Sequence, residues 1–171
     1  MYKKAVFLIL FCVTACGHTG REHAQIIEFV RQGNLTAAQQ LAGKKDLYAD
    51  KPSLLARYFE IGTLHYLNGE YYQALQNFDK AHELSRKLYT KSVSKSVAAQ
   101  IAGDGLAPYT GEKYELSLLR FYQSLTHYKL YEQGYYESYM AQEEGETRVI
   151  ERKELSESEK RLHFNAARAS I

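Results

Sequence analysis

The sequence contains no tryptophan, two prolines, two cysteines and eleven glycines among its 171 residues. So few prolines and glycines exclude a collagen-like or proline-rich chain and argue against a β fold with many turns. The 22 basic and 20 acidic residues nearly balance, so the chain lacks the strong positive charge that accompanies nucleic-acid binding. Hydrophobic residues make up 45 % and charged residues 25 %, which indicates a folded domain rather than a disordered chain.

No long hydrophobic run is present either, and the one short run stands at the N-terminus. Eleven uncharged residues, 5–15, follow Lys3 and Lys4. A membrane-spanning helix needs about 20 apolar residues, so this stretch is too short to cross a bilayer. Its length and basic flank are typical of a secretory signal peptide.

The residues that end this run, Val13-Thr14-Ala15-Cys16-Gly17, resemble the lipobox of bacterial lipoproteins. The resemblance implies cleavage before Cys16, whose thiol then carries the lipid. Because Gly17 replaces the aspartate that retains lipoproteins in the inner membrane of enteric bacteria, the resemblance implies an outer-membrane anchor facing the periplasm. In a cell without an outer membrane, the same lipid would anchor the protein to the cell membrane. An ordinary signal peptide and a buried N-terminal helix are the alternatives.

Cleavage would leave 156 residues with 20 basic and 20 acidic side chains. Residues 1–15 are then the signal peptide and residues 16–22 the lipidated tether. Cys12 is removed with the signal, so no thiol is left for a disulfide, and stability depends on packing alone. Two or more acyl chains anchor a protein stably, whereas one does so only marginally.

Apolar residues in the remaining chain recur at helical spacing. The pattern predicts helices over 24–41 (interrupted at Gly33-Asn34), 53–67, 70–88 and 112–131, and again from residue 135 onward. No stretch alternates with a period of two for long. We therefore predict an all-α domain over residues 23–155, with an inserted helix and loop at 89–111. Ser156 and Glu159 form the capping-box pattern that opens a short C-terminal helix over 156–171.

One segment resembles the tetratricopeptide repeat, a helical hairpin of 34 residues. It reads Tyr58-x-x-Ile61-Gly62-x-x-His65, followed by Ala74-x-x-x-Phe78. His65 takes the place of the usual tyrosine. Gly33-Asn34-Leu35-x-x-Ala38 repeats part of this pattern upstream. An offset of 62 residues superposes Phe121, Ser124, His127 and Tyr128 on Phe59, Gly62, His65 and Tyr66. These partial repeats predict a short α-solenoid of tetratricopeptide-like hairpins.

The stretch 103–130 also resembles a family of longer, poorly characterised tetratricopeptide-like lipoproteins. Its Asp104, Pro108-Tyr109, Gly111-Glu112 and Tyr114-Glu115 match that family's pattern, whereas Gly103 and Gly105 replace asparagines. The loop is either a plain connector or a partner-docking element, in which case the docking residues would be Asp104, Pro108, Tyr109 and Glu112.

No pattern of reactive residues accompanies these helices. The six histidines show no spacing typical of metal ligands, and His65 and His127 are expected to pack between helices. The sequence lacks a Gly-x-Ser-x-Gly motif and a phosphate-binding loop, and its acidic run at 143–146 does not match a calcium loop. We therefore expect no enzymatic activity, no cofactor, no metal site and no small-molecule substrate.

Tyrosine is abundant instead, with 14 of the 15 tyrosines in the predicted mature chain. Interfaces are enriched in tyrosine, because it offers a large contact area at a low entropy cost. Two pairs at the 62-residue offset are candidates for lining a partner-binding groove, although core packing is the better explanation for any single one of them. The candidate groove residues are Phe59, Tyr66, Phe121 and Tyr128.

These observations favour a lipid-anchored adaptor of the cell envelope that binds a protein or peptide partner through a helical-repeat groove. An outer-membrane or cell-wall assembly complex is the expected setting, and no nucleic-acid partner is expected. One alternative is a structural subunit, or a pilotin-like assembly factor of a pilus or secretion system. Another is an envelope enzyme without a recognisable motif.

Overall fold

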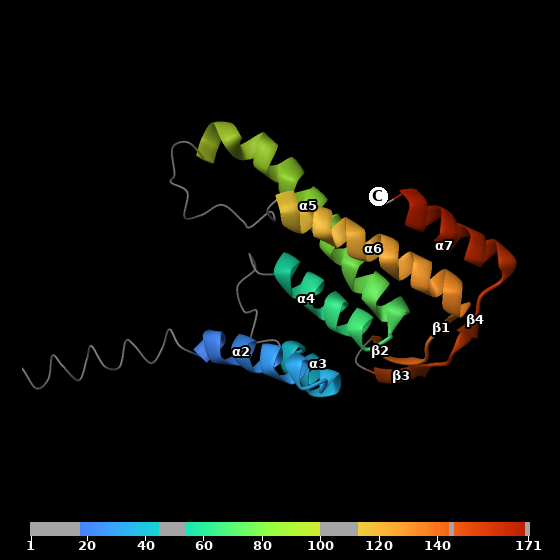
Figure 1. Cartoon of the computed structure of the whole chain (residues 1–171). Coiled ribbons are helices and arrows are strands. Elements are labelled where there is room, and N and C mark those ends of the chain that lie inside the picture. Colours follow the sequence, from blue (N-terminus) through green and yellow to red (C-terminus); the bar gives the residue numbers. More distant parts are fainter. Residues whose placement is uncertain (1–17, 45–53, 100–112, 144–145, 170–171) are drawn as a thin grey trace, which may run out of the picture. The chain divides into compact units, whose positions relative to one another are not determined.

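The computed structural model describes residues 18–44, 54–99, 113–143 and 146–169. The described part is mainly helical, and its helices form packed pairs (Figure 1), so the prediction of a predominantly helical fold is confirmed. The chain divides into two compact units, Met1–Ala49 and Asp50–Ile171, and each is described by itself. The elements are α2 (His18–Arg31), α3 (Leu35–Ala42), α4 (Leu54–Leu67), α5 (Tyr71–Ala99), α6 (Lys113–Gln133), β1 (Tyr135–Tyr136), β2 (Tyr139–Glu143), β3 (Glu146–Ile150), β4 (Lys153–Glu154) and α7 (Glu157–Ala169).

The first unit contains the hairpin of α2 and α3. Gly33 adopts a φ of +73°, a left-handed conformation that glycine reaches without strain, and this residue turns the chain after α2. The side chain of Asn34 then accepts a hydrogen bond from the backbone N–H of Ala37 and caps α3. The predicted break at Gly33-Asn34 is therefore confirmed. The buried residues of this hairpin are Ile26, Ala38, Leu41 and Ala42.

In the second unit, α4 and α5 pack closely because Gly62 has no side chain. A Cβ atom on Gly62 would lie only 2.6 Å from the ring of Phe78, which is fully buried between the helices. Gly69, with a φ of +78°, makes the turn between the two helices. The glycine and the phenylalanine of the repeat-like segment meet at this contact, and its alanine, Ala74, is buried in the same helical unit. The buried cluster consists of Leu55, Ala74, Phe78, Ala81 and Leu119.

Helix α5 is longer than the sequence pattern predicts. It continues without a break from Tyr71 to Ala99, so residues 89–99 extend it and do not form a separate inserted helix. Leu119 of α6 belongs to the buried cluster, and Gln123 of α6 donates a hydrogen bond of 2.8 Å to Asp79 of α5. Burial raises the pKa of Asp79 above its usual range. These contacts pack α6 against the α4–α5 hairpin.

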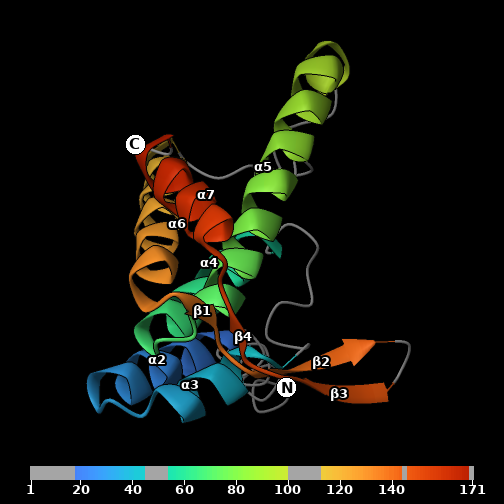
Figure 2. The same cartoon turned by 90° about the vertical axis from the view of Figure 1, so that its right-hand side faces the viewer.

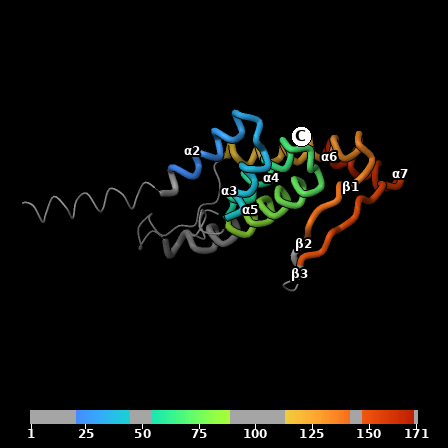
Figure 3. Tube along the Cα trace, turned by 90° about the horizontal axis from the view of Figure 1, so that it is seen from below, coloured from blue at the N-terminus to red at the C-terminus, as the bar shows by residue number. Residues whose placement is uncertain are grey.

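The helix predicted from residue 135 onward is wrong over residues 135–143 and 146–154. Gly134, with a φ of +73°, ends α6, and two pairs of antiparallel strands follow, β1 with β4 and β2 with β3. Figures 2 and 3 show β2 and β3 as an arm that extends away from α6 and α7. Three tyrosines, one threonine, one valine and one isoleucine lie in these strands, and such residues favour extended backbone over helix. The all-α prediction therefore holds for the helical layers and fails for this region.

After β4 the chain forms α7, which lies beside α6 in Figures 1 and 2. The predicted capping box is confirmed at its start. The backbone N–H of Ser156 donates to the Glu159 carboxylate, and the backbone N–H of Glu159 donates to Ser156 Oγ. Further along, Ser124 Oγ on α6 donates a hydrogen bond of 2.6 Å to the carbonyl of Ala167 on α7. The two helices thus form a second packed pair.

Candidate functional site

The four candidate groove residues lie in two different environments. On α4, Phe59 and Tyr66 are partly buried and both pack against Tyr122 of α6, with ring centroids 6.0 Å and 5.5 Å away. Phe59 also meets the buried ring of Phe78 at 6.0 Å. Burial raises the pKa of the Tyr66 hydroxyl, and the neighbouring hydroxyl of Tyr71 adds to this effect. Phe59 and Tyr66 are therefore part of the packing between α4 and α6.

The other pair is exposed on α6. The exposed fraction is 53 % for Phe121 and 44 % for Tyr128. Together with Tyr114 and Leu118, which are also exposed, they follow one another at intervals of four, three and seven residues, so all four lie along one side of the helix. We call this surface the outer face of α6. Only this pair has the exposure that the groove hypothesis requires.

Aromatic contacts continue from the outer face of α6 onto α7. The ring of Tyr128 lies 6.3 Å from that of Tyr131, which lies 5.1 Å from the ring of Phe164 on α7. The Arg168 guanidinium stands 5.9 Å from the centre of the Phe164 ring. Tyr131 and Phe164 are themselves exposed, so the apolar surface is continuous across the α6–α7 pair at this end.

Residues that match at the 62-residue offset occupy similar positions on α4 and α6. Gly62 on α4 faces the following helix α5, and its counterpart Ser124 on α6 bonds to the following helix α7. The ring of His65 on α4 is paired with Glu70, next to the start of α5. Its counterpart, His127 on α6, bonds to a side chain of α7. His65 thus links α4 to the turn before α5, whereas His127 links α6 directly to α7.

His127 belongs to a buried chain of polar groups that sequence reasoning did not find. Its Nδ1 lies 2.8 Å from Nδ1 of His163 on α7, and Nε2 of His163 lies 2.8 Å from the hydroxyl of Tyr136 on β1. His163 is only 7 % exposed. Burial lowers the pKa of His127 and, with the neighbouring charge of His127, lowers the pKa of His163 to about 4. At neutral pH both rings are therefore uncharged.

The strand region packs against the start of α5. Tyr136 stacks on Tyr72 with ring centroids 4.1 Å apart. The carboxylate of Glu137 accepts a 3.0 Å hydrogen bond from the backbone N–H of Gln73 in the first turn of α5. This contact satisfies one of the free amide groups that every helix start presents. No regular spacing in the sequence relates residues 136–137 to residues 72–73, so the sequence gives no signal for these contacts.

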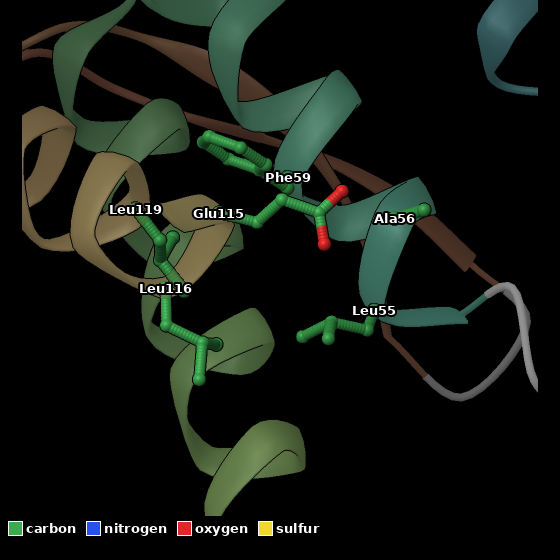
Figure 4. A pocket seen from close by; sticks show the side chains of 6 residues that line it. All are labelled: Leu55, Ala56, Phe59, Glu115, Leu116 and Leu119. Atoms are coloured by element: carbon green, nitrogen blue, oxygen red, sulfur yellow. The ribbon is translucent and has the colours of Figure 1, made fainter. Parts of the chain in front are cut away.

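A small apolar cavity opens between the starts of α4 and α6 (Figure 4). Its free volume is about 20 Å³, which is room for one water-sized group. Drug-sized ligands occupy pockets of about 300–1,000 Å³, so this cavity suits no small-molecule ligand. Its lining residues are Leu55, Ala56, Phe59, Glu115, Leu116 and Leu119.

Two groups of predicted site residues lie outside the described residues. They are Cys16, and the candidate docking-loop residues Asp104, Pro108, Tyr109 and Glu112. Among the helices that the structure describes, none is both long and apolar enough to cross a bilayer. Within the same residues, no group of three or more histidine, cysteine, aspartate or glutamate side chains is placed to hold a metal ion.

Comparison of the chain with protein-family models, with curated proteins and with solved structures found no match.

Proposed function

We propose that this protein is a lipid-anchored adaptor of the cell envelope that binds a protein partner on the outer face of α6. The observation that carries the proposal is the exposure of Phe121 and Tyr128, whose counterparts Phe59 and Tyr66 are covered by another helix. Exposed aromatic residues in a row on one helix are typical of protein-binding surfaces. In this proposal the protein is a binding protein and not an enzyme.

The arrangement of the helices supports a repeat architecture for this adaptor. In the proposed architecture, α4–α5 and α6–α7 are successive tetratricopeptide-like hairpins of a short solenoid, and the strands 135–154 are an insertion in the second. The close contact at Gly62 and the side-chain bonds at His65 and His127 recur at equivalent places. Because each hairpin in such a stack packs against its neighbour, the last one presents an uncovered face.

The lipobox-like sequence before Cys16 supports the anchor. In this proposal the lipidated cysteine holds the domain at the membrane, facing the periplasm in a cell with an outer membrane. The tether predicted over residues 16–22 is shorter in the structure, because α2 begins at His18 and its helical residues cannot serve as an extended linker. The anchor would therefore raise the local concentration of the α6 face near other envelope proteins.

Site-specific cross-linking tests the proposal in the native cell envelope. A photo-reactive amino acid at position 121 or 128 should give one discrete cross-linked product, whereas the same group at Leu162 should not give that product. Leu162 is the matched control because it is an exposed apolar residue of α7. If positions 121, 128 and 162 give the same products, or none, the proposed binding face is wrong.

A pair of tyrosine substitutions separates binding from folding. Tyr128→Ala should remove the product formed at position 121 and lower the free energy of unfolding by less than about 1 kcal/mol, because its ring is exposed. Tyr66→Ala should cost about 2–4 kcal/mol, because that ring packs against Tyr71 and Tyr122. Equal losses of stability in the two variants would show that Tyr128 is a packing residue and would contradict the proposal.

A further inference from the structure

The structure contains a covered equivalent of the outer face of α6. On α4, Phe59 and Tyr66 stand two helical turns apart, and the ring of Tyr122 lies between them. Both contacts are edge-on, with interplanar angles of 71° and 79°. Such edge-to-face pairs are favourable beyond the area that they bury. The residue that enters between the two rings comes from a neighbouring helix, α6.

Phe121 and Tyr128 repeat this pair with the same seven-residue spacing on α6, and no ring of a described helix enters between them. The small residue and the histidine that stand between the two aromatic residues in the sequence are also placed alike on the two helices. We infer that the outer face of α6 receives an amphipathic helix of a partner protein, and that one aromatic side chain of this helix enters between Phe121 and Tyr128 as Tyr122 enters between Phe59 and Tyr66. This inference rests on the proposed function and names its partner.

The shape of the surface favours a helix over an extended peptide. One way to bind an extended peptide is to pair its backbone with the free edge of a sheet, and α6 cannot do this because its backbone is hydrogen-bonded within the helix. Side chains on a helix form ridges and grooves that accept those of another helix. The stretch from Tyr114 to Tyr128 is about 21 Å long, which equals about four turns of a partner helix.

The size of the surface argues against a second copy of this chain as the occupant. A fully covered aromatic side chain buries about 150–250 Å², so the apolar side chains of this surface, about half exposed and including Tyr131 and Phe164, offer roughly 500 Å² per copy. A stable protein–protein interface buries about 800 Å² on each partner. An area of this size is that of a weak, transient interface, in which an aromatic anchor on a partner helix carries most of the binding energy.

The sequence of α6 supplies the probe, because α6 is the helix that covers the equivalent face of α4. We would measure binding of a labelled, capped peptide of residues 113–133 to the full-length chain by fluorescence anisotropy. The expected result is saturable binding that weakens at least tenfold when the peptide carries Tyr122→Ala. A double substitution Phe121→Ala/Tyr128→Ala in the protein should weaken binding equally, while Leu162→Ala should leave it unchanged.

Three results would overturn the inference. The first is an absence of peptide binding. The second is binding that survives Phe121→Ala/Tyr128→Ala, because the peptide would then replace α6 on α4. The third is a dimer of the chain alone, seen by sedimentation and abolished by Phe121→Ala, because a second copy would then be the occupant. Cross-links at positions 121 and 128 judge the proposed function separately, so a protein partner captured there without peptide binding contradicts only the helix inference.

Discussion

Gly62 leaves no room for a side chain, because an added Cβ would lie 2.6 Å and 2.7 Å from two atoms of the Phe78 ring. We expect Gly62→Ala to lower the free energy of unfolding by about 1–3 kcal/mol. Alanine is the better helix former by about 1 kcal/mol, so a net loss would show that the clash outweighs helix propensity. Chemical denaturation of the two proteins measures the difference.

Ser117→Ala is the matched control for this prediction. Ser117 is solvent-exposed and lies away from both ends of α6, so removing its hydroxyl should change the free energy of unfolding by no more than about 0.5 kcal/mol. A Gly62→Ala protein that is more stable than wild type would show that α4 and α5 are not in close contact at this point.

His163 makes the stability of the protein depend on pH. Its pKa is about 4 in the folded chain and 6.5 in its ordinary environment, so the unfolded chain binds a proton first as the pH falls. The free energy of unfolding therefore does not depend on protonation of His163 above pH 6.5, falls as the pH drops from 6.5 to 4, and reaches a constant lower value below pH 4. The total loss is about 3 kcal/mol. Glu159 acts in the opposite direction on the pKa of His163, since its negative charge favours the protonated ring.

His163→Gln removes the titrating group, so the pH dependence of the unfolding free energy between pH 6.5 and 4 should be shallower than in the wild type. The NMR signal of the His163 ring supplies a second measurement that does not need a variant. A folded-state pKa near 6.5 in that titration would contradict the prediction.

Single residues differ in how far the sequence predicts their role. The close approach at Gly62 could be predicted, because a glycine weakens the interior of a helix and therefore indicates a point where a second helix needs the space. The exposure of Phe121 and the partial burial of Tyr122 could not be predicted, since the two are adjacent aromatic residues on a helix with apolar side chains on several sides. The role of His163 could not be predicted either, because its partners come from α6 and from a strand far away in sequence.

Among the elements, the helices with clear start and end signals were predicted well. The break at Gly33-Asn34 and the capping box at Ser156 depend on neighbouring residues, so the sequence shows them directly. The strands were missed because β1 and β4 have two residues each and β2 and β3 five, too few for a period of two to stand out. The extension of α5 to Ala99 was missed because its polar residues show no apolar stripe.

The arm formed by β2 and β3 should contribute little to stability. Its paired residues Met140 and Val149 are 74 % and 59 % exposed, and a hairpin of two strands is only marginally stable by itself. We expect that deleting residues 141–148 and joining Met140 to Val149 through Asn-Gly changes the free energy of unfolding by less than about 1 kcal/mol. Urea denaturation measures this change.

Tyr136→Ala is the control at the base of the arm. It removes the stack on Tyr72 and the bond to His163, and we expect it to cost more than about 2 kcal/mol. A shortened arm that destabilises the protein as much as Tyr136→Ala would show that β2 and β3 are part of the core.

For the whole molecule, the proposed role needs both a binding face and a membrane anchor, and only the first lies in the described residues. The helical domain shows how a partner could be bound but contains no signal for location. The predicted signal for location lies within the first 17 residues. The two parts therefore have to be tested separately, the face by cross-linking and the anchor by changing the cysteine.

Cys16→Ala should release the protein from the membrane fraction and abolish labelling by a fatty-acid probe, because the thiol that carries the lipid is lost. Acyl chains contribute about 0.8 kcal/mol for each buried CH₂ group, so removing them should shift the protein almost completely to the soluble fraction. Cys12→Ala is the matched control, since this cysteine lies within the predicted signal peptide and would not be present in the mature protein. It should leave both labelling and partitioning unchanged. A Cys16→Ala protein that stays with the membranes after a high-salt wash, or a Cys12→Ala protein that loses the label, would contradict the lipid anchor at Cys16.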